Sequence, residues 1–374
     1  MENKKTIFGL YYKWWKNIDK FLFFLIIFLF IIGLFFSLVS TSLLVSDKLE
    51  TNDYTFFFKH LTFVILGLII IFVLSSINEK KLLKISPIIF ILSLFSLMLV
   101  PIIGVEVNSA QRWIDLYMLP RFQPIELVKP FLIILISLIL SNEKYNNVYL
   151  KYLFSFLLTL LIALLLAAQP DIGQTLLIFF TWSVLIFISG INIIFLITSS
   201  LIIIMMLYLS INFIPKFAYI KSRILSFFNT ETGTHNAQSE KAIDSITSGG
   251  FFGKGIGEGT LKNRVPEAHT DYIISVISEE FGVIAIILIL SLFLIFIHSV
   301  FKKVYLEQDE RTKLILVGCI SLILVQAMIH IGVNIRLFPT TGITLPFISY
   351  GGSSIISISI LSGIILNLTK RKIK

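Results

Sequence analysis

The chain is poor in charged residues, in cysteine and in histidine. Charged residues make up 14% of its 374 positions, against about a quarter in an ordinary soluble domain. The single cysteine, Cys319, excludes a disulfide within the chain, and the five histidines form no His-Glu-x-x-His pattern of the kind that binds zinc. These absences exclude a disulfide-stabilised secreted domain, and no metal site is expected from the sequence.

Apolar residues are abundant instead, at 56% of the chain with a mean hydropathy of +0.92. The available polar residues could not cover that much Ile, Leu and Phe in water, whereas a lipid-facing surface should be apolar. The composition therefore predicts an all-α integral membrane protein. The net charge of +9 is then explained by Lys and Arg in cytoplasmic loops, so no nucleic-acid partner is expected.

A helix that crosses about 30 Å of hydrocarbon needs roughly 20 apolar residues. The run after residue 20 is too long for a signal peptide and lacks a small-residue cleavage site, so it is expected to be the first transmembrane helix. We expect one polytopic domain, residues 1–374, surrounded by membrane lipid. Ten stretches meet or nearly meet the length of a span: 21–45, 57–76, 87–104, 124–141, 152–168, 172–189, 193–214, 272–298, 314–335 and 348–368.

Lys and Arg predict the orientation, because they accumulate in short cytoplasmic loops. With the N-terminus inside, both termini are cytoplasmic, and the one long polar segment, 214–271, lies outside between helices seven and eight. Five segments then fall inside and carry five, three, two, four and four of the 31 Lys and Arg residues: 1–20, 77–84, 142–151, 301–313 and 369–374.

Charged residues gather before and within predicted helix four. Arg112 and Arg121 lie near Trp113 at the outer interface, where they either bind phosphate or carboxylate or snorkel in an ordinary aromatic belt, which the pattern alone favours. Glu126 and Lys129 share one helix face at i and i+3 and can pair. Ionisable groups at membrane depth face a cavity or one another, so this face is expected to point into the protein, whether the pair is structural or functional.

The long segment contains the glycine run Ser248–Thr260. Alternating glycines let a backbone turn tightly and approach a ligand closely. The run is not a phosphate-binding P-loop, because Gly255 follows Lys254 where that motif has Ser or Thr after the lysine. A flexible loop is the simplest explanation of the glycines.

The same segment ends with His269, Thr270 and Asp271 at the predicted start of helix eight. Thr270 or Asp271 either caps the helix, which the spacing favours, or Asp271 is a general base at the mouth of a cavity. About two turns further on, Glu279 and Glu280 point in different directions, so at least one is expected to face the protein interior or another helix.

Two prolines and a Gly-Gly pair interrupt the predicted start of helix ten, within Pro339–Ser354. Irregular backbone at membrane depth must be buried in protein or line a wet cavity. The small hydroxyl residues of this segment suit a polar head group.

Together these stretches resemble one family, SEDS (shape, elongation, division and sporulation), whose members include FtsW and RodA. Pro266–Asp271 and Thr340–Pro346 look more like the division-type FtsW branch than like RodA. The motifs that carry the resemblance run in family order from helix three to helix ten: Ala110–Ile114, Phe122–Pro124 with Glu126 and Lys129, Gln169-Pro170-Asp171 with Gly173, Ser248–Gly250, Gly253–Gly259, Pro266–Asp271 with Glu279–Gly282, and Thr344–Ser354.

The resemblance implies an enzyme, a peptidoglycan glycosyltransferase. Such an enzyme polymerises lipid II, a disaccharide-peptide on undecaprenyl diphosphate, at the outer face of the bacterial cytoplasmic (inner) membrane. The family's catalytic aspartate falls on Asp271. No cofactor is established by the resemblance, and a requirement for a divalent cation stays open. Substrate contacts are expected at Arg112, Gln123, Glu126, Lys129, His269, Thr270, Ser349, Gly351, Gly352 and Ser353.

The family also implies partners, namely a class B penicillin-binding transpeptidase that crosslinks the new glycan, and divisome proteins at the division septum. Two other functions stay open: a lipid II flippase, and the elongation role of RodA. A transporter should need groups accessible from both faces, so the clustering of ionisable residues toward the outside favours the polymerase. A non-enzymatic division scaffold would have no use for an acid beside a polar cavity.

Overall fold

The computed structural model describes residues 7–41, 54–107, 110–115, 120–143, 147–191, 193–213, 221–222, 225, 227, 234–260 and 268–370. Several predicted features lie outside these ranges. They are the end of the first span after Thr41, much of the long segment 214–271 including Pro266, and the four C-terminal residues.

Among the described residues, ten long helices form the body of the protein, and each overlaps one of the ten apolar stretches of the sequence. Helix α1 (Ile7–Asn17) precedes them, and helix α11 (Thr234–Gly249) lies in the long segment, where the sequence predicts only a polar loop. The ten are α2 (Lys20–Thr41), α4 (Thr55–Ser76), α5 (Glu79–Ile103), α6 (Pro124–Leu140), α7 (Val148–Ala168), α8 (Ile172–Ile188), α9 (Ile193–Phe213), α12 (Ile273–Leu306), α13 (Glu310–Asn334) and α14 (Gly352–Leu368).

A short β-hairpin between α5 and α6 adds a feature that the sequence pattern does not predict. Strand β1 (Val105–Val107) pairs antiparallel with β2 (Ala110–Trp113). The Gln111 side chain donates a hydrogen bond to the Gly104 carbonyl at 2.7 Å, which closes the hairpin onto the end of α5. The hairpin places Arg112 beside the start of α8.

Length and apolar composition mark seven of the helices as able to cross a membrane: α2, α4, α5, α7, α9, α12 and α13. Helices α8 and α14 are apolar and shorter, with 17 residues each. Helix α9 exposes large apolar side chains such as Ile194 and Met205, whereas α13 and α14 are buried along most of their length. The chain is therefore a helical, multi-pass membrane protein with α13 and α14 at its centre.

Helices α4 and α14 approach closely because small residues line their contact. A Cβ atom added to Gly67 on α4 would overlap the Ser359 hydroxyl, and one added to Gly363 on α14 would lie 2.9 Å from the Leu74 side chain. Lipid tails are as apolar as the helices, so close packing of this kind is a main source of helix association in membranes. This contact holds the last helix in the centre of the bundle.

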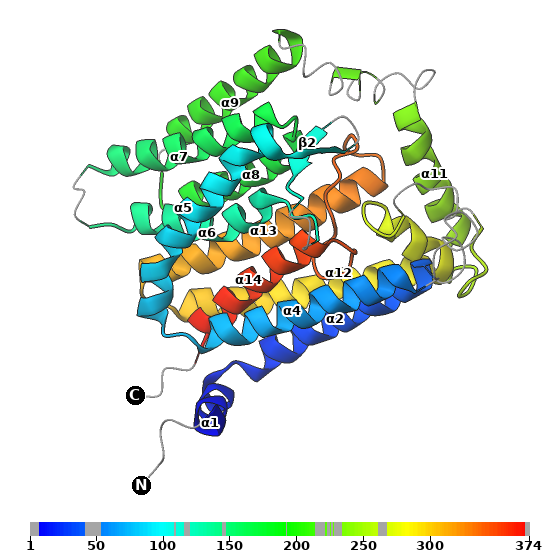
Figure 1. The fold of residues 1–374 in the computed structure, drawn as a ribbon, viewed down its shortest axis with the longest axis horizontal. Coiled ribbons are helices and arrows are strands. Elements are labelled where there is room, and N and C mark those ends of the chain that lie inside the picture. The colour runs from blue at the N-terminus through cyan, green and yellow to red at the C-terminus, as the bar shows by residue number, and fades with distance from the viewer. Residues whose placement is uncertain are drawn as a thin grey trace.

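The bundle has two distinct ends. Helix α1 and the C-terminal end of α14 lie at one of them, and α11 lies at the other (Figure 1). At the first end, Lys303 Nζ is 2.7 Å from Asp19 Oδ2, and Asn367 donates hydrogen bonds to the carbonyls of Leu74 and Ile77 at 2.6 and 2.7 Å. Helices α6, α8, α12 and α14 begin at the opposite end, called the site end below because it holds the candidate residues.

Helix α12 is broken at Gly282, whose φ of 74° and ψ of −175° are not helical. The break leaves backbone carbonyls of the preceding turn without their usual helical partners, and such groups need others when buried. The Lys254 N–H donates to the Glu279 carbonyl at 2.9 Å, and the Gly255 N–H donates to the Glu280 carbonyl at 3.0 Å. The glycine run therefore supplies the hydrogen bonds that the interrupted helix lacks.

The run Gly249–Gly259, called the glycine strap below, fits tightly around this break. A Cβ atom at Gly253 would overlap the Glu280 carbonyl, and Gly253 has a φ of 79°, which a residue with a side chain rarely adopts. A Cβ atom at Gly249 would overlap the Ser278 carbonyl. The glycines serve close backbone approach, so the flexible loop that the sequence suggested is instead a fitted cover over the helix break.

Candidate active site

A buried polar triad lies at the site end, between α6 and α8. Lys129 Nζ donates to Glu126 Oε1 at 2.8 Å and to Gln174 Oε1 at 3.1 Å, and Gln174 Nε2 donates to Glu126 Oε1 at 2.9 Å. Lys129 is 1% exposed and Glu126 is 4% exposed. A lone charge is costly at such depth, so each member of the triad depends on the others. The predicted pairing of Glu126 with Lys129, and the inward direction of this face of α6, are confirmed.

The junction before α8 joins this triad to the β-hairpin. Asp171 caps α8 by accepting the Gln174 N–H at 3.3 Å. Arg112 Nε lies 3.6 Å from Asp171 Oδ2, and its Nη2 donates to the Pro170 carbonyl. Gln123 Nε2 donates to the same carboxylate at 3.1 Å. Arg112 therefore points into the protein, and the snorkelling position that the sequence pattern favoured is wrong.

The segment between α13 and α14 also reaches this junction. Ser353 Oγ accepts the Gln123 N–H at 3.0 Å, which ties the N-terminus of α14 to that of α6. Ser349 accepts a backbone N–H of its own segment at 2.9 Å, and Gly351 and Gly352 have neighbours where a Cβ atom would lie. These four residues hold irregular backbone in place at the site end, and their contact with a substrate stays a prediction.

The turn before α12 carries the predicted catalytic aspartate. Tyr272 occupies the N-cap position of α12. The helix cap that the spacing favoured at Thr270 or Asp271 is therefore wrong. The Asp271 carbonyl accepts a hydrogen bond from Asn334 Nδ2 at 3.0 Å, and a Cβ atom added to Gly342 would lie 3.5 Å from Asp271 Oδ2. The half-buried Asp271 carboxylate thus lies against the segment that joins α13 to α14.

His269 belongs to an aromatic cluster beside this turn. The centroid of its ring is 4.9 Å from that of Phe56 and 6.0 Å from that of Tyr350, and the His269 carbonyl accepts the Tyr350 N–H at 3.1 Å. The His60 ring lies 5.8 Å from the Tyr350 ring. The cluster connects the start of α4 to the turn that holds Asp271.

Glu279 and Glu280 are both buried, at 0% and 1% exposure, so both acids and not only one of them face inward. Lys254 Nζ lies 3.3 Å from Glu279 Oε1. The glycine strap therefore supplies a cation as well as backbone donors to the short first part of α12, directly after Asp271.

Gly173 connects the two halves of the site. It lies two residues after Asp171, and a Cβ atom added to it would lie 2.9 Å from the Thr341 side chain, next to Gly342. The segment after α13 thus touches both the Asp171 junction and the Asp271 turn. The structure brings the candidate residues of β2, α6, the turn before α12 and the start of α14 together at one end of the bundle.

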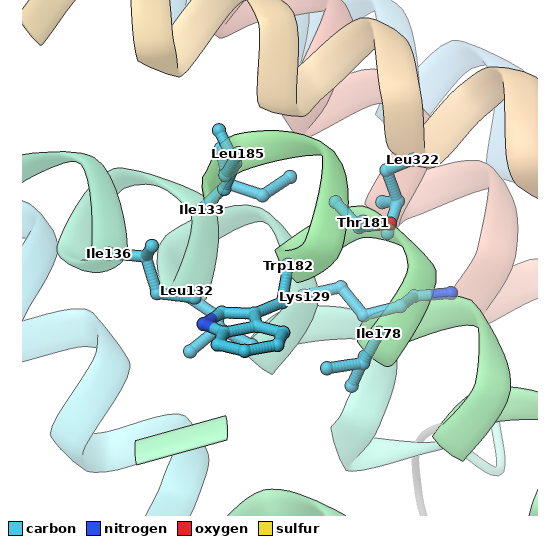
Figure 2. Close-up of a pocket in the computed structure, with 9 residues that line it drawn as sticks. All are labelled: Lys129, Leu132, Ile133, Ile136, Ile178, Thr181, Trp182, Leu185 and Leu322. Atoms are coloured by element: carbon cyan, nitrogen blue, oxygen red, sulfur yellow. The ribbon is translucent and has the colours of Figure 1, made fainter. Parts of the chain in front are cut away.

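A small cavity lies beside the Lys129 stem, and Figure 2 shows the lysine nitrogen pointing away from its apolar walls. Its volume of about 10 Å³ leaves room for one water molecule at most. It is a packing void beneath the triad and is far too small for a substrate. Its lining residues are Lys129, Leu132, Ile133, Ile136, Ile178, Thr181, Trp182, Leu185 and Leu322.

No metal centre is apparent in the part of the chain that the structure describes. There, no three His, Cys, Asp or Glu side chains are grouped so that they could hold an ion. The divalent cation that the sequence left open therefore has no ready set of ligands among the described residues.

The cell cycle protein family of FtsW, RodA and SpoVE matches residues 19–374. The chain belongs to this family. A probable peptidoglycan glycosyltransferase FtsW from Wigglesworthia glossinidia brevipalpis is 34% identical, over 96% of this chain and 93% of that protein. The FtsW of the same description from Enterococcus hirae is 35% identical, over 85% of this chain and 84% of that protein.

A solved structure supports the assignment to the FtsW–RodA family. It comes from work on the structural coordination of polymerization and crosslinking by a peptidoglycan synthase complex. The two chains are 26% identical, with a TM-score of 0.78, over 94% of this chain and 97% of the other. The resemblance to SEDS proteins of the FtsW type is thereby confirmed.

Three residues of this family member take part in the site although the sequence did not single them out as site residues: Asp171, Gln174 and Asn334. Each is a polar residue within or next to an otherwise apolar helix. Such a group costs free energy in a membrane unless it is paired, so its presence is itself a signal. The partners could not be found from the sequence, because Gln174 lies 45 positions from Lys129 and Asn334 lies 63 positions from Asp271.

Proposed function

We propose that the protein is a peptidoglycan glycosyltransferase that polymerises lipid II into glycan strands for septal cell-wall synthesis in cell division. The observation that carries this proposal is the place of Asp271, a half-buried carboxylate held at one end of a membrane bundle beside a cluster of paired charges. Membership of the family and the names of the FtsW relatives support the same reaction. A substrate with a lipid tail can reach such a site from the bilayer.

The reaction requires a base. In the proposed step the 4-hydroxyl of the acceptor sugar attacks the anomeric carbon of the donor, and Asp271 takes the hydroxyl proton. The bond between that carbon and the diphosphate oxygen breaks, and undecaprenyl diphosphate leaves with the electron pair. No nucleotide is needed, because the diphosphate already carries the driving force.

The leaving diphosphate requires positive charge or aligned dipoles. The N-termini of α6, α8 and α14 meet where Gln123 contacts Asp171 and Ser353, so the positive ends of three helix dipoles lie together. We assign neutralisation of the diphosphate to Arg112 and these helix ends, and we assign shaping of the site to the Glu126–Lys129 pair. The other proposed substrate contacts lie at the same end: His269, Thr270, Ser349, Gly351 and Gly352.

The proposed topology has ten spans, both termini in the cytoplasm and the segment 214–271 outside, within one polytopic domain of residues 1–374. The shared end of α1 and α14 (Figure 1) supports this, because lysines of the predicted cytoplasmic segments lie there, such as Lys16, Lys303 and Lys370. In this topology the site end faces the outer side of the cytoplasmic membrane. We place the protein at the division septum with divisome proteins.

A polymerisation assay tests the function. Purified protein is given labelled lipid II, with and without a class B penicillin-binding transpeptidase, and glycan strands are resolved by electrophoresis. Wild type is expected to make strands, and Asp271→Asn is expected to make at least about 100-fold fewer, the usual contribution of a general base. Near-wild-type synthesis by Asp271→Asn would remove Asp271 from the mechanism.

The matched control is Asp115→Asn. Asp115 is an exposed acid that follows strand β2 of the hairpin. It lies 3.0 Å from Arg121 in a surface ion pair worth about 0–1 kcal/mol. Its removal is expected to leave strand synthesis unchanged. A comparable loss in this variant would mean that the assay responds to any lost carboxylate at the site end.

The rival functions have their own outcomes. If wild type makes no strands while labelled lipid II crosses proteoliposome membranes, the protein is a flippase. Rescue of cells depleted of their elongation polymerase, but not of cells depleted of their division polymerase, would show the RodA role. The transpeptidase partner is proposed from the family and from the synthase complex to which the chain is similar, and faster synthesis in its presence is the expected result.

A further inference from the structure

The last turn of α13 holds the backbone of the Asp271 turn through one side chain. Asn334 is 0% exposed, and its Nδ2 donates to the Asp271 carbonyl at 3.0 Å and to the His330 carbonyl at 2.9 Å. Its Oδ1 accepts the Ser275 N–H at 3.3 Å. One amide therefore fixes the residue before the N-cap of α12, the first turn of α12 and the end of α13 relative to one another.

His330 lies one turn earlier on the same face of α13 and holds the segment after α13, which lies against the Asp271 carboxylate. Its Nδ1 is 2.8 Å from the Ile343 carbonyl. A carbonyl oxygen accepts and never donates, so the proton of the ring lies on Nδ1. Asn334 and His330 thus anchor two separate segments, the Asp271 turn and the 341–343 segment, on one face of a buried helix.

These two segments meet at the carboxylate. Gly342 has a φ of 73°, and a Cβ atom added to it would lie 3.5 Å from Asp271 Oδ2. The distance between the Asp271 turn and the 341–343 segment is set by α13, because a buried side chain of α13 binds one main-chain carbonyl in each. A shift of the Asp271 turn would therefore change where the carboxylate lies relative to Gly342.

We infer that Asn334 is a positioning residue for Asp271 in the proposed polymerisation. It holds the carbonyl of Asp271, and through it the carboxylate, in the geometry in which the carboxylate can take the proton of the acceptor hydroxyl. The inference rests on the proposed function and adds to it a residue that does not touch the substrate. Misplacement of a catalytic group by about 1 Å costs roughly 100-fold in rate, which sets the expected size of the effect.

The chain offers a matched control at the opposite end of the bundle. Asn367 is also a buried asparagine whose Nδ2 donates to two main-chain carbonyls, those of Leu74 and Ile77. Replacing either asparagine removes the same kind of hydrogen bonds from a helix end. Any loss that comes only from a weakened fold should therefore appear in both variants.

The test uses Asn334→Ser and Asn367→Ser in the full-length protein, with kcat and KM for labelled lipid II and the thermal midpoint of each. Serine suits position 334 because its hydroxyl can donate to the carbonyl four residues earlier, as Ser321 donates to Val317 at 2.7 Å here, but is too short to reach Asp271. Asn334→Ser is expected to keep a midpoint close to that of Asn367→Ser. Its kcat is expected to fall about 100-fold with KM changed less than about threefold.

The outcomes separate this inference from the proposed function. A wild-type protein that makes no strands in the presence of its partner overturns the proposed function itself. If wild type is active, an Asn334→Ser protein with unchanged kcat, or with a raised KM and unchanged kcat, overturns the positioning role. Equal losses of kcat in Asn334→Ser and Asn367→Ser overturn it too, because they reduce Asn334 to a purely structural residue.

Discussion

Removal of Lys129 tests whether the buried triad is held together by charge. In Lys129→Met the volume of the side chain is nearly conserved, but Glu126 keeps only the amide donor of Gln174 at 2.9 Å. Lys129 and Glu126 are buried, at 1% and 4% exposure, so little solvent screens the loss. Breaking a buried ion pair by removing one partner costs about 3–5 kcal/mol, and we expect the free energy of unfolding to fall by this amount.

The double variant Lys129→Met with Glu126→Gln decides the cause. It removes both charges and leaves two amides that can hydrogen-bond, so it is expected to recover most of the loss, because a neutral pair carries no buried charge. Equilibrium unfolding in mixed micelles, followed by the fluorescence of the four tryptophans, measures all three proteins. The exposed pair supplies the control, since Arg121→Met is expected to cost about 0–1 kcal/mol.

Two results would refute this reasoning. A single variant that loses no more than Arg121→Met would mean that the pair contributes nothing beyond a surface contact. A double variant as unstable as Lys129→Met would mean that the loss comes from packing rather than from an unpaired carboxylate. Either result would mean that the members of the triad do not depend on one another through charge.

Two further predictions concern the glycine strap and the end of the bundle that holds α1. Gly253→Ala is expected to destabilise the protein and impair polymerisation, because the new Cβ atom would overlap the Glu280 carbonyl. The control is Gly250→Ala, which has a φ of 58° and no neighbour within 4 Å and is expected to cost only the backbone strain of about 1–2 kcal/mol. Thermal midpoints and strand synthesis of the two variants are compared, and equal effects would contradict the close fit of the glycine strap. Burial raises the pKa of Asp19. Hydrogen bonds from the Lys303 side chain and nearby backbone, together with the Lys303 charge, lower the pKa by more, so it lies below its usual 3.8. The stability from the contact of Asp19 with Lys303 is therefore complete above the pKa of the unfolded state and is lost as pH falls through the pKa of the folded state. The variant Asp19→Asn should make the free energy of unfolding less dependent on pH below about pH 4. An unchanged pH profile would contradict this role of Asp19.

The helices could be predicted because a membrane imposes one simple demand, a long apolar run for each span. The Glu126–Lys129 pair could be predicted for a similar reason, since its two residues are neighbours on one helix turn. The contacts of Arg112 could not, because they depend on how β2 meets the start of α8. The break at Gly282 was hidden as well, since glycine alone does not reveal a non-helical φ inside an apolar run.

The bond between Gln123 and Ser353 joins residues 230 positions apart, and Asn334 and Gly342 also belong to the last tenth or so of the chain. Chains emerge from the ribosome N-terminus first, so the early helices exist for some time before these residues are made. Until these residues have been made, the Gln123 N–H lacks its Ser353 acceptor, and the Asp271 turn lacks the hydrogen bond from Asn334 and the neighbouring Gly342 segment. A chain that stops before α14 would therefore be catalytically inactive, because the proposed site needs residues from α13, from the segment after it and from the start of α14.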